Sequence, residues 1–108
     1  MIYAVLANLY FDTPAKQDQL SQFISDKIAG KLIWGSVIRA NGFDEFSKPT
    51  SNIEIRLENQ VDMDELYDLI KDKMIHIPVL KGTVSKHNCF HDGRPLDSCH
   101  IKEEFKKE

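Results

Sequence analysis

The segment from residue 87 to residue 100 concentrates side chains that bind metal ions. It contains three of the four histidines of the chain and both cysteines: His87, His91, His100, Cys89 and Cys99. His87, Cys89 and His91 are spaced two residues apart, and alternate side chains of an extended strand share one face. Their Cα atoms would lie about 7 Å apart along a strand, so modest bending lets all three approach one ion.

A turn signal after this strand offers a route by which the second cysteine returns. Residues 92–95 read Asp-Gly-Arg-Pro, a composition typical of turns. A turn of about three residues would place Cys99 opposite Cys89, with both sulfurs and two imidazoles on one face. A turn that differs by one residue would send Cys99 to the other face and favour His100, because a shift in register inverts the faces.

The predicted metal site consists of His87, Cys89, His91 and Cys99. Two imidazoles and two thiolates form a tetrahedral set that suits zinc, and iron suits it less well. Four protein ligands would indicate a structural ion, whereas three ligands and a water would leave a position for catalysis or sensing. Other interpretations stay open: buried structural thiols, a disulfide or redox pair, and histidines that only line a turn.

The elements that must position this segment follow in the order β-α-β-β-α-β. Alternating or continuous apolar runs predict the strands, and apolar residues at helical spacing predict the helices. The strands are expected over residues 2–11, 32–40, 52–58 and 79 to about 90. The helices are expected to begin at residues 12–14 and 62, and to end at Gly30 and before Pro78.

Local signals mark the ends of these elements. Thr13 can cap the first helix, and Pro14 suits the first helical position because its missing N–H costs nothing there. Asp62 opens the second helix, with Glu65 three residues later as in a capping box. Asn41-Gly42 is expected to break the second strand.

This order predicts a single α+β domain of ferredoxin-like type over residues 1–108. In that arrangement an antiparallel sheet carries both helices on one face, and the first and third strands lie in its middle. The core is expected over about residues 1–90. A C-terminal extension over about residues 91–108 is expected to fold back as a hairpin or short helix, and the mixed charges of residues 101–108 favour a solvated helix end.

Helices on one face leave the other face of the sheet to solvent or to a partner. The third strand alternates, which directs Ile53, Ile55 and Leu57 toward the helices and Glu54, Arg56 and Glu58 to the open face. The first strand is apolar on both of its faces. An apolar strip beside a charged strip favours a homo-oligomer.

Charge and hydropathy exclude two classes of partner. The formal net charge is −3, from 14 basic and 17 acidic residues, which argues against a nucleic-acid binder. The apolar run at residues 1–7 is far too short for a membrane span and has no basic leader, so a cytoplasmic protein with reduced thiols is expected.

Three functional hypotheses remain. The first is a small, non-enzymatic oligomeric protein that binds zinc, or acts as a regulator, through His87, Cys89, His91 and Cys99. The second is an enzyme with a cleft between two sheets that binds a small organic molecule through Tyr10, Arg39 or a histidine. The third is a thiol-based redox regulator that uses Cys89 and Cys99. Asn8 and Arg56 are further polar candidates, interpreted as surface polarity on the strands.

Overall fold

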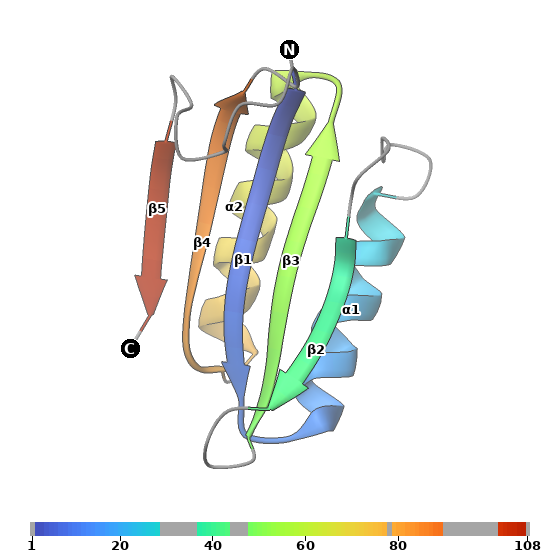
Figure 1. The fold of residues 1–108 in the computed structure, drawn as a ribbon, viewed down its shortest axis with the longest axis vertical. Coiled ribbons are helices and arrows are strands. Elements are labelled where there is room, and N and C mark those ends of the chain that lie inside the picture. The colour runs from blue at the N-terminus through green and yellow to red at the C-terminus, as the bar shows by residue number, and fades with distance from the viewer. Residues whose placement is uncertain (1, 29–36, 44–47, 78, 90–101, 108) are drawn as a thin grey trace.

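The computed structural model describes residues 2–28, 37–43, 48–77, 79–89 and 102–107, and these form an α+β fold. Figure 1 looks onto the antiparallel sheet, with both helices behind it, so the predicted class and the placement of the helices on one face are confirmed. The elements in chain order are β1 (Ile2–Phe11), α1 (Pro14–Ile28), β2 (Val37–Phe43), β3 (Pro49–Leu57), α2 (Gln60–His76), β4 (Val79–Cys89) and β5 (Lys102–Lys107).

The strands of the sheet follow the order β2-β3-β1-β4-β5. β1 pairs antiparallel with β3 on one side and with β4 on the other, so the first and third strands are inner strands, as the element order predicts. β5 pairs antiparallel with β4 and forms one edge, and β2 forms the other. The helices therefore cover one face of the sheet, and no described helix covers the other, which we call the open face.

The hydrophobic core lies between the sheet and the two helices. Ile53, Ile55 and Leu57 are buried there, which confirms the direction predicted for the third strand. From β1 the core takes Val5, Ala7, Leu9 and Phe11; from α1 Leu20, Ile24 and Ile28; and from α2 Met63, Leu66, Ile70 and Met74. The helical residues recur three or four positions apart, which gives each helix one apolar stripe.

The helix starts differ in how well the sequence predicts them. α1 begins at Pro14, and Thr13 caps it by accepting a hydrogen bond from Lys16 N at 3.4 Å. The predicted start of α2 at Asp62 is wrong, because the cap is Asn59, whose side chain accepts from Asp62 N at 2.9 Å. Asn59 Nδ2 in turn donates to Asp62 Oδ2 at 2.9 Å, so a reciprocal pair of hydrogen bonds joins residues 59 and 62, although the second bond is between side chains and does not complete a capping box.

The predicted break at Asn41-Gly42 is also wrong. β2 continues through both residues to Phe43, and they pair with Ser51 and Thr50 of β3. The continuous pairing of residues 40–43 with β3 outweighs the local turn preference of the dipeptide. Residues 32–36 of the predicted strand lie outside the described residues.

The C-terminal tail forms β5 and not the end of a helix, so that expectation is wrong. Phe105 packs against the core. Glu103 Oε2 forms an ion pair with Lys86 Nζ at 2.8 Å. Lys107 Nζ donates to Met74 O at 2.9 Å, in the last turn of α2, where carbonyls lack helical partners. These three contacts hold β5 against β4 and α2. Among the described helices, none has the length and hydropathy needed to cross a membrane.

Candidate ligand-binding groove

Polar side chains stand in register across three strands on the open face of the sheet. Asn8 of β1 lies opposite Thr83 of β4, which lies opposite Lys106 of β5. One step further along the sheet, Tyr10 of β1 lies opposite Lys81 of β4. β5 ends here, since its last residue pairs with Gly82, while β1 and β4 continue (Figure 1).

An open groove of about 350 Å³ occupies this place. A volume of that order suits a small molecule, at the lower end of the usual range for ligand sites. The groove is lined by Asn8, Tyr10, Lys81, Gly82, Thr83, Lys106 and Lys107.

Positive charge dominates the groove. Lys81 and Lys106 are exposed, and Lys81 Nζ lies 4.6 Å from the centre of the Tyr10 ring, within the range of a cation–π contact. Lys107 is held by its bond to the carbonyl of Met74. None of the described residues that line the groove is acidic.

The donors in the groove suit an anion. Each lysine ammonium offers three N–H donors, and the amide of Asn8 and the hydroxyl of Thr83 add further donors. Charge-assisted hydrogen bonds from ammonium groups to carboxylate or phosphate oxygens are among the stronger polar contacts in proteins. The arrangement can therefore hold a compact molecule with several acceptor oxygens.

The structure describes only part of the predicted metal site. His87 of β4 is buried, with 4% of its surface exposed, and its Nε2 lies 2.9 Å from Ser85 Oγ. Cys89 is the last residue of β4, two positions further on. His91 and Cys99 lie outside the described residues, as does His100. Within the described ranges, no group of three or more His, Cys, Asp or Glu side chains is placed to hold a metal ion.

The other polar candidates divide between the groove and its surroundings. Asn8 and Tyr10 line the groove. Arg56 lies on the open face of β3, where its Nη2 is 2.9 Å from Glu54 Oε2, and Arg39 lies within β2. The groove lysines were not predicted from the sequence, although polar residues at every second position of β4 after Leu80 indicate its open face.

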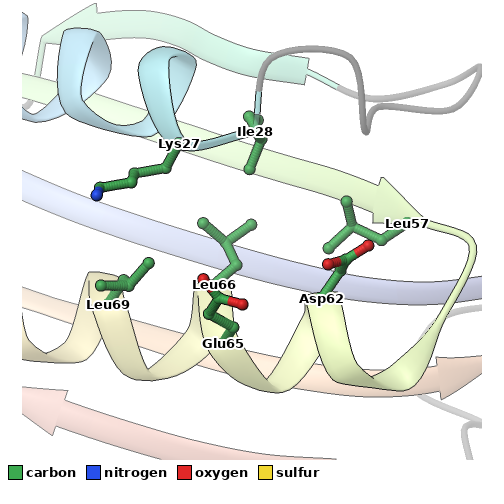
Figure 2. Close-up of a pocket in the computed structure, with 7 residues that line it drawn as sticks. All are labelled: Lys27, Ile28, Leu57, Asp62, Glu65, Leu66 and Leu69. Carbon is green, nitrogen blue, oxygen red and sulfur yellow. The ribbon is translucent and has the colours of Figure 1, made fainter.

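A second hollow between the helices is too small for a ligand. Figure 2 shows it between the C-terminal end of α1 and the N-terminal half of α2, with the Lys27 side chain extending toward Leu69 and away from the carboxylates of Asp62 and Glu65. Its volume of about 10 Å³ admits roughly one water molecule. The remaining lining residues are Ile28, Leu57, Leu66 and Leu69, so this hollow is a packing defect beside the core.

No protein-family model matches this sequence, and no curated protein matches it. The function is therefore inferred from the chemistry of the groove.

Proposed function

We propose that this protein is a small binding protein that holds a compact anionic molecule in the groove on the open face. The observation that carries the proposal is the groove of about 350 Å³ with Lys81 and Lys106 exposed in it and Asn8 and Thr83 beside them. The chain as a whole carries a net charge of −3, so its groove is basic against the overall charge. Such local fields favour association with ligands of opposite sign.

The fold is consistent with a ferredoxin-like domain extended by one strand. The order β2-β3-β1-β4, with both helices on one face, supports that interpretation, and β5 adds to the β4 edge. Because one fold of this kind hosts many unrelated functions, the fold by itself does not select a ligand.

A phosphate group fits the groove better than a single carboxylate. Two ammonium groups that approach from β4 and β5 can each contact a different oxygen of a doubly charged ion. Lysine binds as a compact point charge and, unlike arginine, does not require a planar acceptor pair. We therefore expect a phosphate monoester or a comparable dianion as the ligand class.

Removal of either charge is expected to weaken anion binding. Lys81→Gln and Lys106→Gln keep a polar side chain and should each raise the Kd for inorganic phosphate roughly two- to fivefold, the range of a partly exposed ion pair. Isothermal titration calorimetry at constant low ionic strength measures the change. The matched control is Lys71→Gln, on α2 away from the groove, which should leave the Kd unchanged.

The outcome of that titration decides the proposal. If phosphate and small phosphate monoesters give no saturable heat, or if Lys71→Gln weakens binding as much as the groove variants, the groove is not the binding site. Circular dichroism of each variant shows that the fold is retained.

A zinc-binding or regulatory role for His87, Cys89, His91 and Cys99 is the second candidate. Its support is the pairing of His87 with Lys102, which are side by side in β4 and β5 and flank the predicted ligands in the sequence. Predicted ligands that lie between two paired residues have a shorter distance to cover in order to converge on one ion. The alternative redox role likewise requires Cys89 and Cys99 to approach each other.

Metal analysis tests this second candidate. Protein purified without a polyhistidine tag is expected to contain about one zinc ion per chain, and a chelator should lower its melting temperature. Cys89→Ser should lower the zinc content, whereas His76→Gln, on the exposed end of α2, should not. Absence of stoichiometric metal together with an unchanged melting temperature in chelator would eliminate the zinc role.

A further inference from the structure

Two oppositely charged side chains stand side by side on the open face of β5. Glu104 lies opposite Ser85 and Lys106 lies opposite Thr83, both in β4. Their neighbours on the helix side of the strand are accounted for, since Glu103 pairs with Lys86 and Phe105 packs on the core. Glu104 and Lys106 are both exposed, and their Cα atoms are about 7 Å apart from the rise of a strand.

The negative charge of Glu104 and the positive charge of Lys106 form a self-complementary pattern. A two-fold axis that runs across the strands, midway between Glu104 and Lys106, would place each of them opposite the other residue on a second copy. A two-fold axis along the strands, midway between β1 and β4, would instead bring Glu104 close to Glu54. Opposite charges favour the first arrangement and like charges disfavour the second.

Leu6 of β1 supplies apolar contact near the centre of the same face. It is half-buried, and the register places it between Glu54 and Ser85, whereas Ala4, two positions earlier on the strand, is fully buried and adds no contact area. With the axis across the strands, Leu6 would lie against the region of Asn8 and Leu6 on the second copy. The Leu6 side chains of the two copies would then lie near the axis, with the charged pairs at the edge of the interface.

The size of the open face suits a weak dimer. Five strands about 4.8 Å apart, each about seven residues long at about 3.3 Å per residue, span about 20 Å by 25 Å. Because Ala4 and His87 on this face are already buried, two such faces would bury at most about 1,000 Å² in total, at the low end of specific interfaces. A concentration-dependent equilibrium is therefore expected.

We propose that a second copy of this chain docks face to face on the open sheet, with Glu104 of each copy paired to Lys106 of the other. Docking does not require the groove to bind a ligand. Because Lys106 also lines the groove, the proposal rests on the proposed function in one respect: an anion in the groove competes with the second copy.

Charge reversal tests the docking. Sedimentation equilibrium at low ionic strength should show a dimer for the unchanged protein, and Glu104→Lys or Lys106→Glu should each raise its dissociation constant about tenfold or more. The double variant with both reversals should restore the dimer to within a few-fold. Asp72→Lys, on the exposed side of α2, is the control and should leave the constant unchanged.

The results separate this proposal from the proposed function. A protein that stays monomeric, a dimer indifferent to the single reversals, or a double variant that does not recover would each overturn the docking. Glu104 does not line the groove, so Glu104→Lys should still bind inorganic phosphate. Phosphate binding without a dimer refutes only the docking, whereas a charge-dependent dimer that binds no phosphate refutes the proposed function and the competition.

Discussion

Replacement of Lys86 by alanine is expected to lower the free energy of unfolding by about 2 kcal/mol, more than a typical surface lysine. Lys86 joins three elements, because its ammonium lies 2.9 Å from Asp64 of α2 and 2.8 Å from Glu103 of β5. It also lies 4.9 Å from the centre of the Tyr67 ring. Only 14% of its side chain is exposed, so alanine would also leave a void.

The expected loss is moderate because the two carboxylates are hydrated. Asp64 and Glu103 are 41% and 61% exposed, so each can recover water after the substitution and avoid the larger penalty of a fully buried orphan charge. Lys86→Met, which restores most of the volume, should recover part of the loss.

Denaturant unfolding measures the effect against a matched control. Lys71 lies 5.0 Å from the same Tyr67 ring and 3.7 Å from Asp68, but on the solvent side of α2. Lys71→Ala is expected to change the free energy of unfolding by less than about 0.5 kcal/mol. Equal losses for Lys71→Ala and Lys86→Ala would show that burial between α2 and β5 adds nothing.

The Lys86 contribution also has a defined pH dependence. Hydrogen bonds to Glu103 and Asp64 raise the pKa of Lys86 above its usual 10.5 against the opposing effect of burial. A group with a raised folded-state pKa stabilises the protein fully below its unfolded pKa and loses that effect as the pH rises through the folded pKa. The difference between the unchanged protein and Lys86→Met should therefore be constant near neutral pH and decline only above about pH 10.5.

A valine at position 82 is expected to destabilise the protein by about 3 kcal/mol, and an alanine by about 1–2 kcal/mol. A Cβ at Gly82 would lie 2.7 Å from Leu9 Cδ2, 3.0 Å from the backbone oxygen of Asn8 and 3.3 Å from Met74 Cε. Leu9 and Met74 are fully buried, so neither can swing into solvent. The backbone oxygen cannot move without disturbing the pairing of β1 with β4.

The neighbouring residue provides the control for this substitution. Thr83→Val exchanges one β-branched side chain for another of nearly the same shape on the open face of the same strand, and should change stability little. Thermal unfolding of both variants gives the comparison. Retention of full stability by Gly82→Val would mean that the core between β1 and α2 is looser than the contacts of Gly82 indicate.

β1, β3, β4 and the two helices were predictable because their signals are local and repeated. The alternation of Ile53, Ile55 and Leu57 requires one buried face, and Pro14 after Thr13 marks a helix start. β5 was not predictable, because a single apolar residue in a charged tail gives no strong pattern. Its inward-facing Glu103 and Lys107 are satisfied by Lys86 and by the carbonyl of Met74, which only the folded chain brings near.

The groove could not be predicted from the sequence for a similar reason. Asn8 and Tyr10 were recognisable as polar or half-polar residues on a strand, but their neighbours Lys81, Thr83 and Lys106 come from strands far away in the sequence. A shared face depends on register, and register depends on the whole sheet. The His/Cys segment shows the opposite case, where close spacing in the sequence gives a clear hypothesis that stays a prediction.

Titration of the isotope-labelled protein with inorganic phosphate, followed by backbone amide chemical shifts at constant ionic strength, tests the central claim most directly. We predict saturable shifts at Asn8, Thr83 and Lys106 that share one dissociation constant, with Lys27 and Glu65 beside the helical hollow unaffected. Saturable shifts confined to another surface, or none at all, would contradict the assignment of the groove as the binding site.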